Sequence, residues 1–230
     1  MTGRTLSIIV PCYNEERTAG LLLQKVLDAP TPGWKKEVII IDDASTDGTR
    51  EILRGFESRA TVIYLAQNAG KGSAVRRGLL HATGEYILLQ DADLEYEPRD
   101  IASLLAVIDK GEAQVVYGSR NLRPRERRGA WIPRAGVWFL TKLINVLWGL
   151  SLTDVWTCYK LFPREAGADF APGRFESELL FTAALARQGY RFAEAPIRYH
   201  PRDAEDGKKI RYRDGLSAII VLVLDKIRHG

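Results

Sequence analysis

Two aspartates separated by one residue, Asp91 and Asp93, follow a short apolar segment that ends at Leu89. Carboxylates packed side by side repel one another, and a divalent cation removes that repulsion. Carboxylate oxygens, completed by water and substrate phosphates, are the ligands that Mg²⁺ prefers, and Mn²⁺ accepts the same donors. Glu95 can supply a third oxygen. The spacing therefore predicts a site for Mg²⁺ or Mn²⁺, although the same tripeptide in an ordinary turn would only cap the helix that follows near Pro98.

Two further polar segments also follow β-branched runs. Residues 11–16 (PCYNEE) come after Leu6–Val10, and Asp42 and Asp43 come after Val38–Ile41. In an open α/β sheet, ligands bind beyond the carboxyl ends of the strands. A carboxylate at such an end can accept a hydrogen bond from a nucleotide base or a ribose hydroxyl, and of the two we assign this role to Asp43. The same residues also predict a turn closed by side-chain hydrogen bonds.

The segment Asn68–Gly72 (NAGKG) is rich in glycine but lacks the spacing of a P-loop. Two interpretations stay open. The glycines suit a tight turn from a strand into a helix. Lys71, at the start of that helix, can instead neutralise a phosphate bound at the helix N-terminus.

The hydrophobic pattern of the sequence indicates which strands and helices must position these side chains. Short β-branched runs alternate with helical patterns and short loops, which predicts a mostly parallel sheet covered on both faces. We expect strands at 6–10, 38–41, 61–65, 86–89, 114–118, 161–162 and 191–199. We expect helices at 15–27, 49–56, 71–81, 100–110, 135–150, 176–187 and 215–228.

Composition limits the class of protein. The 230 residues are 46% hydrophobic and 27% charged, with a net charge of +4, which excludes a disordered or fibrous chain. Two cysteines suggest a reducing compartment, and no secretory signal precedes the first strand. We therefore expect a cytoplasmic protein, soluble or peripheral on the cytoplasmic face of a membrane.

Basic and apolar residues concentrate in the second half. Six arginines and one acid lie between Ser119 and Arg134, and six basic residues and three acids lie between Arg198 and Arg213. One such run is typical of a solvated loop, but two in one small protein favour an anion-binding surface. No nucleic-acid-binding motif accompanies them, so we expect no nucleic-acid partner. The helix predicted at 135–150 is apolar on nearly every face. Such a helix lies either in the core or in the plane of a membrane interface.

Five motifs together resemble the family 2 inverting glycosyltransferases, and most of all the group of dolichyl-phosphate mannosyltransferases and polyprenyl-phosphate glycosyltransferases. They are residues 7–15 (SIIVPCYNE), 41–49 (IDDASTDGT), 68–72 (NAGKG), 90–93 (QDAD) and 118–120 (GSR). The resemblance covers about residues 6–214. It implies a GT-A fold, a Rossmann-like three-layer α/β/α sandwich with a mostly parallel central sheet. It also implies a nucleotide-sugar donor, Mg²⁺ or Mn²⁺ as cofactor, and a polyprenyl phosphate acceptor.

The resemblance also implies roles for individual residues. Nucleotide-sugar binding falls to Pro11, Tyr13, Glu15, Asp43, Lys71, Asp91, Ala92, Arg202, Lys208 and Lys209, the last three in a mobile loop that closes over the donor phosphates. The metal falls to Asp93, assisted by Asp91 and Glu95. Catalysis falls to Asp93, to Arg120 near the phosphates and to Asp154 at the acceptor.

We thus expect a single GT-A domain over residues 1–230. Residues 1–118 would bind the nucleotide sugar, and residues 119–230 would bind the acceptor and carry the apolar helices. The donor stays open between GDP-mannose and UDP-glucose or UDP-GlcNAc, because one aspartate can hydrogen-bond either base. A phosphate acceptor is ionised at pH 7 and needs no base, whereas a soluble or glycan hydroxyl, the alternative acceptor, needs Asp154 or Glu178 to take its proton. A non-catalytic nucleotide-sugar-binding protein is the remaining alternative.

Overall fold

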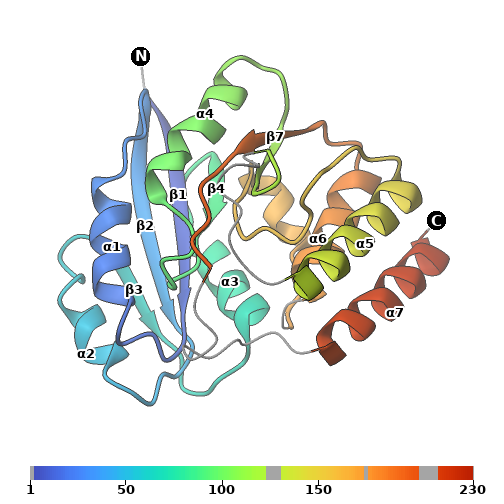
Figure 1. Cartoon of the computed structure of the whole chain (residues 1–230). Coiled ribbons are helices and arrows are strands. Elements are labelled where there is room, and N and C mark those ends of the chain that lie inside the picture. The colour runs from blue at the N-terminus through green and yellow to red at the C-terminus, as the bar shows by residue number, and fades with distance from the viewer. Residues whose placement is uncertain (1–2, 123–130, 174–175, 202–211, 230) are drawn as a thin grey trace.

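Seven strands form one central sheet in the residues that the computed structural model describes, 3–122, 131–173, 176–201 and 212–229 (Figure 1). The strands are β1 (Arg4–Cys12), β2 (Trp34–Asp42), β3 (Thr61–Tyr64), β4 (Tyr86–Leu89), β5 (Val115–Ser119), β6 (Lys160–Pro163) and β7 (Phe192–Pro196). Their order is β3-β2-β1-β4-β6-β5-β7. Of these seven, β6 alone runs antiparallel to its neighbours β4 and β5. The predicted mostly parallel sheet is therefore confirmed.

Helices cover both faces of the sheet. They are α1 (Ala19–Asp28), α2 (Thr49–Arg54), α3 (Lys71–Leu79), α4 (Ile101–Asp109), α5 (Trp131–Trp148), α6 (Glu176–Arg187) and α7 (Tyr212–His229), with two 3₁₀ segments, η1 (Pro98–Asp100) and η3 (Arg164–Asp169). One layer holds α1 against α2 and η1, while α3 packs on β1 and β2 and meets η3. Right-handed crossovers explain this division, because the chain reverses its direction across the sheet between β3 and β4. The result is the expected three-layer α/β/α sandwich.

The first strand is longer than the sequence predicted. We expected Pro11 to end it, but β1 continues to Cys12, and Pro11 is paired with Ile41 of β2. The prediction was wrong because proline lacks only an N–H donor. The ladder between β1 and β4 ends at the pair Ile9 and Leu89, so on that side Pro11 has no strand partner that needs a donor.

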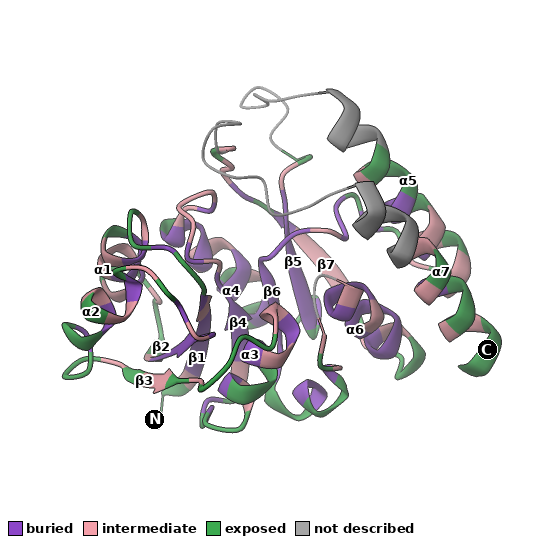
Figure 2. Cartoon of the chain, turned by 90° about the horizontal axis from the view of Figure 1, so that it is seen from below, coloured by how far each residue is buried: buried purple, intermediate pink, exposed green. Residues whose placement is uncertain are grey.

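The two long helices of the second half divide their apolar residues between core and surface. On α5, Leu140 and Ile144 are buried, whereas Trp138, Phe139 and Val146 are exposed. On α7, Leu222 is buried, and the exposed apolar side chains are Ile220, Val223, Leu224 and Ile227. The helices lie side by side (Figures 1 and 2). Among the described residues, no helix is both long and apolar enough to cross a membrane.

Two helical glycines with opposite surroundings test the packing of α3 on the sheet. A Cβ at Gly78 would lie 2.6 Å from Cγ2 of Ile9 in β1, whereas a Cβ at Gly136 of α5 would meet nothing within 4 Å. Alanine improves helix propensity at both positions by up to about 1 kcal/mol. Overpacking costs about 1–3 kcal/mol where there is no room. We expect Gly78→Ala to lower and Gly136→Ala to raise the free energy of unfolding in urea denaturation. Equal stabilisation by both substitutions would contradict the close contact.

Candidate active site

Three polar segments meet at one edge of the sheet because β1 lies between β2 and β4 and all three are parallel. The chain proceeds from β1 outward to β3 and then returns to β4 on the other side of β1, so the connections leave β1 in opposite directions. This is the topological switch point at which open α/β sheets bind ligands. Pro11–Glu15, Asp42–Asp43 and Gln90–Asp93 all follow strands at this edge, which lies at the end of β1 opposite the N-terminus in Figure 1. The sequence-predicted sites thus come together.

Unusual backbone conformations occur within the first of these segments and directly after the other two. Asn14, Ala44 and Leu94 have φ values of 52°, 59° and 61°, and no other non-glycine residue of the described chain has a positive φ. Such conformations cost free energy and persist where surrounding contacts enforce them. One of those contacts is a hydrogen bond of 2.8 Å from the Thr46 N–H to Oδ1 of Asn14, which joins the loops after β1 and β2. Asn14 therefore links loops and does not cap α1, which begins only at Ala19.

Asp43 holds the glycine-rich loop in place. Its two carboxylate oxygens accept hydrogen bonds from the N–H groups of Ala69 (2.8 Å) and Gly70 (2.9 Å). Gly70 has a φ of 87°, which glycine adopts without a steric penalty. Asp43 is 3% exposed. Base recognition by Asp43 stays a prediction, and the structure adds a second task, because this carboxylate sets the position of Lys71.

Asp42, by contrast, is a buried carboxylate that forms an ion pair with the half-buried Arg50. Its Oδ2 lies 2.6 Å from Nε of Arg50, and the same guanidinium donates to the carbonyl of Leu65 at 2.6 Å. The carboxylate therefore fastens β2 to α2 and to the segment after β3. The choice of Asp43 over Asp42 as the ligand stays a prediction.

Lys71 connects two carboxylates from different elements. Its Nζ lies 2.5 Å from Oδ1 of Asp91 and 2.8 Å from Oε1 of Glu178 on α6. The other carboxylate oxygen of Glu178 accepts a hydrogen bond of 2.8 Å from Lys160 of β6. Burial disfavours the charge on Lys71, but Asp91 and Glu178 outweigh it and hold the pKa of this ammonium well above its usual value. Burial likewise opposes the charge on Glu178, whereas Lys160 and Lys71 lower the pKa of its carboxyl.

The candidate metal ligands differ in how strongly other groups engage them. Asp91 contacts Lys71 and the thiol of Cys158, whose pKa is raised well above its usual value first by burial and then by Asp91. Asp93 accepts a hydrogen bond of 3.1 Å from the N–H of Glu95. Glu95 itself accepts one of 2.9 Å from the hydroxyl of Tyr199.

The described residues contain no group of three His, Cys, Asp or Glu side chains arranged to hold a metal by themselves. Mg²⁺ is commonly bound through one or two carboxylates together with substrate phosphates, and hard oxygen donors are the appropriate type. The carboxylates of Asp93 and Asp91 therefore fit a dication that shares its coordination with a bound diphosphate. Glu95, one oxygen of which accepts the hydrogen bond from Tyr199, stays the third predicted ligand.

Arg120 forms a bidentate ion pair with the buried Asp154. Nε and one terminal nitrogen of Arg120 donate to the two oxygens of Asp154 at 2.7 and 2.8 Å, and the guanidinium lies 5.0 Å from the ring centre of Tyr199. Burial disfavours the arginine charge, but Tyr96 and Asp154 outweigh it and raise its pKa. Both oxygens of Asp154 are therefore occupied by its own partner, a contact that the sequence did not predict.

The other predicted nucleotide-binding residues are spread around the same edge. Tyr13 is partly exposed, whereas Glu15 and Ala92 are buried. Glu15 accepts a hydrogen bond of 2.8 Å from the Thr18 hydroxyl at the start of α1. Pro11 lies within the last two residues of β1.

Several predicted residues cannot be placed. Arg202, Lys208 and Lys209 lie outside the described residues, as do Arg123, Arg125, Arg127, Arg128 and the side chain of Arg134. Their roles stay predictions.

The sequence did not reveal that Glu178, Lys160 and Tyr199 contact the candidate site residues. A signal existed for two of them. Lys160 begins the otherwise apolar segment Lys160–Pro163, and all four residues of that strand are buried. Glu178 lies among apolar residues of α6 and is 4% exposed. Buried charges of this kind require partners.

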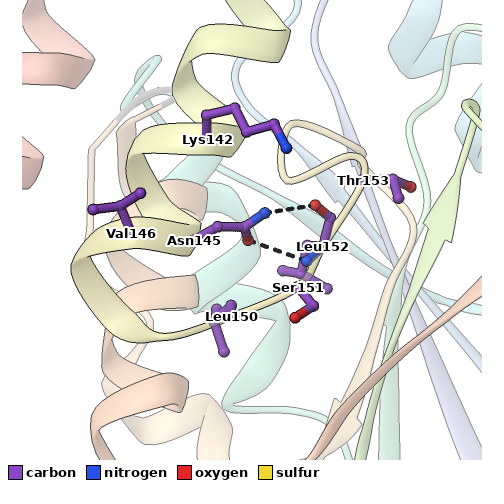
Figure 3. Close-up of a pocket in the computed structure, with 7 residues that line it drawn as sticks. All are labelled: Lys142, Asn145, Val146, Leu150, Ser151, Leu152 and Thr153. Carbon is purple, nitrogen blue, oxygen red and sulfur yellow. Dashed lines mark hydrogen bonds between the residues drawn. The ribbon is translucent and has the colours of Figure 1, made fainter.

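A pocket of about 420 Å³ lies beside the C-terminal half of α5 (Figure 3). Its wall is fixed by Asn145, whose side chain donates to the carbonyl of Leu152 at 2.8 Å and accepts from the N–H of the same residue at 3.1 Å. Lys142 and Thr153 also line it. The pocket belongs to the part after residue 119, and Thr153 directly precedes Asp154.

Comparison with protein families gives an independent finding. The profile described as "Glycosyl transferase family 2" matches residues 7–169. Dodecaprenyl-phosphate galacturonate synthase from Rhizobium johnstonii is 30% identical over 162 residues, which cover 68% of this chain and 47% of that protein. Dolichyl-phosphate beta-glucosyltransferase from Dictyostelium discoideum is 28% identical over 246 residues, covering 97% of this chain and 73% of that one. The chain spans about half the length of several curated relatives that it matches.

Solved structures share the fold. Glucosyl-3-phosphoglycerate synthase from Mycobacterium tuberculosis, crystallised with Mn²⁺, UDP and phosphoglyceric acid, superimposes with a TM-score of 0.73. The match covers 97% of this chain and 79% of that one at 22% sequence identity. At this identity, the similarity establishes the architecture of the sheet and its helices.

Proposed function

The chain belongs to glycosyl transferase family 2, and from this premise we propose that it transfers a sugar from a nucleotide-diphosphate donor to a polyprenyl phosphate, with inversion at the anomeric carbon and with Mg²⁺ or Mn²⁺ as cofactor. The observation that carries the proposal is the meeting of Asp43, Lys71, Asp91 and Asp93 at the switch point of the sheet. We further propose that residues 1–230 act as one GT-A domain, with the donor bound by residues 1–118.

The donor side of the proposal is supported by the chemistry of this edge. A nucleoside diphosphate carries several negative charges, and the ammonium of Lys71 lies at the N-terminus of α3, where the helix dipole also favours anions. Asp93 and Asp91 would hold the dication. When bound, the dication would stabilise the negative charge of the departing diphosphate. The fold neighbour was crystallised with UDP and Mn²⁺, which agrees with a donor of this class.

The acceptor side is supported by the state of the two carboxylates that could otherwise serve as a base. Transfer to a hydroxyl requires a group that takes its proton. Asp154 accepts three hydrogen bonds from Arg120, one from its backbone N–H and two from its guanidinium, and the pKa of Glu178 is lowered by Lys160 and Lys71. Both carboxylates are therefore already engaged by basic side chains of this chain. A phosphate acceptor needs no such base, and two relatives carry dodecaprenyl phosphate and dolichyl phosphate in their names.

A lipid acceptor would also explain why α5 and α7 expose apolar side chains on one face. Trp138, Val146 and Ile227 are 61%, 81% and 74% exposed. Tryptophan is enriched at the level of lipid head groups, where an apolar ring and a polar N–H are both accommodated. Lys226 and Arg228 follow on α7 and can approach anionic head groups. We propose that this face rests on the membrane that contains the acceptor.

Replacement of Asp93 tests the catalytic proposal. We expect Asp93→Asn to abolish metal-dependent transfer while the unfolding free energy stays near that of the wild type, because the amide keeps the shape but loses the charge. The assay is turnover of GDP-mannose, UDP-glucose and UDP-GlcNAc, with and without polyprenyl phosphate and with and without EDTA. Substantial turnover by the variant, or full wild-type turnover in EDTA, would contradict the metal role. Transfer to a soluble hydroxyl acceptor, with none to polyprenyl phosphate, would contradict the proposed lipid phosphate acceptor.

Vesicle flotation tests the membrane face. We expect the wild type to float with phosphatidylcholine vesicles, and to a greater extent when phosphatidylglycerol is added. The double variant Val146→Glu/Ile227→Glu should float much less, since two charges would enter the apolar layer. Leu80→Glu is the matched control, because Leu80 is 72% exposed but lies just after α3. Membrane binding would be contradicted if the wild type stayed in the unbound fraction. It would also be contradicted if light scattering showed a wild-type dimer that Val146→Glu/Ile227→Glu dissociates, since the face would then be covered by a second copy.

A further inference from the structure

Four charged side chains alternate in sign from the candidate site into the core. Asp91 after β4 contacts Lys71 of α3, Lys71 contacts Glu178 of α6, and Glu178 contacts Lys160 of β6, at 2.5, 2.8 and 2.8 Å. Lys160 is fully buried, and Glu178 is almost so. Buried charges persist only where partners satisfy them, so each member depends on the next.

The first contact of this series competes with the proposed function. Asp91 would help to hold a dication, and an ammonium 2.5 Å from one of its oxygens would repel that ion. Lys71 must therefore give up much of its contact with Asp91 when the donor complex binds. Its second contact, with Oε1 of Glu178, does not involve a candidate metal ligand and can remain.

Glu178 is itself fixed from the other side. Its Oε2 accepts a hydrogen bond from Lys160, which also donates to the carbonyl of Thr157 and lies 5.0 Å from the ring centre of Tyr117. Lys160 therefore keeps the Glu178 carboxylate turned toward the site.

The backbones that carry Lys71 and Glu178 are also joined. The N–H of Gly72 donates to the carbonyl of Gly173 at 2.9 Å, and a Cβ at Gly72 would lie 2.5 Å from Oγ of Ser177. The first turn of α3 therefore packs directly on the first turn of α6. A side chain on α6 can act on Lys71 only if these two helix starts keep a fixed separation, and this close packing provides it.

We propose that Glu178 is a positioning residue for the donor. It keeps the ammonium of Lys71 at the edge of the sheet after Asp91 has been engaged, so that this cation faces the diphosphate. The inference rests on the proposed function. In this role the Glu178 carboxylate takes no proton from the acceptor; it stays ionised and acts through Lys71.

A double-mutant cycle measured by calorimetry tests the inference. The probes are UDP and GDP, each with saturating MnCl₂, titrated into the wild type, Lys71→Met, Glu178→Gln and the double variant. We expect Lys71→Met to weaken binding about tenfold, as for the loss of one charge-assisted hydrogen bond. Glu178→Gln should weaken it by a smaller factor. The double variant should bind no more weakly than Lys71→Met alone, because Glu178 acts through that lysine.

Controls separate positioning from general damage. Glu37→Gln removes a partly buried carboxylate that accepts hydrogen bonds from Thr83 and Ser7, and it should leave nucleotide binding unchanged. Where Glu178→Gln does not fold, Glu178→Asp replaces it in the cycle, since it keeps the charge but shortens the reach to the lysines. Additive losses in the double variant, or unchanged binding by either single variant, would overturn the inference. A wild type that binds neither UDP nor GDP with MnCl₂ would instead contradict the proposed function.

Discussion

The site depends on one constraint: the acids that gather at the functional edge of the sheet must each be paired with a cation or with hydrogen-bond donors. Parallel strands end together, so the carboxylates that follow them gather in a small volume, and each one requires a partner. Asp42 is paired with Arg50, Asp43 with the N–H groups of the glycine-rich loop, and Asp91 with Lys71. Because each partner comes from a different segment, the pairings also fix the loops.

The same pairings decide which chemistry the edge supports. The acids that could serve as a base are bound to cations, whereas Lys71 and Arg120 stay at the edge. Their pKa values are raised, by Asp91 and Glu178 for Lys71 and by Tyr96 and Asp154 for Arg120. An arrangement of this kind stabilises negative charge on phosphates better than it removes protons. This is the physical reason to favour an ionised acceptor over a hydroxyl, and a lipid phosphate would also suit the exposed apolar side chains of α5 and α7.

Much of the fold could be predicted from periodicity. The runs 38–41 and 86–89 are strands, and the helix 176–187 begins and ends where expected. The strand ends were less predictable, since Pro11 is compatible with a ladder that has no partner for it on one side. That the acidic segments meet could be predicted, because each of them follows a strand. Which side chains pair with these acids could not be predicted, because partners such as Lys71 and Glu178 lie far apart in the sequence. The sequence also could not decide whether the helix predicted at 135–150 lies in the core or at a surface. Its residues Leu140 and Val146 are both apolar, but the first is buried and the second is exposed.

The most direct test of the central claim is a crystal structure of the chain grown with MnCl₂ and a nucleoside diphosphate, recorded at a wavelength where manganese scatters anomalously. The account predicts one anomalous peak between a carboxylate oxygen of Asp93 and the diphosphate, with the base beside Asp43 and Lys71 still in contact with Glu178. A nucleotide bound away from the ends of β1, β2 and β4, or a manganese ion without Asp93 among its ligands, would contradict it.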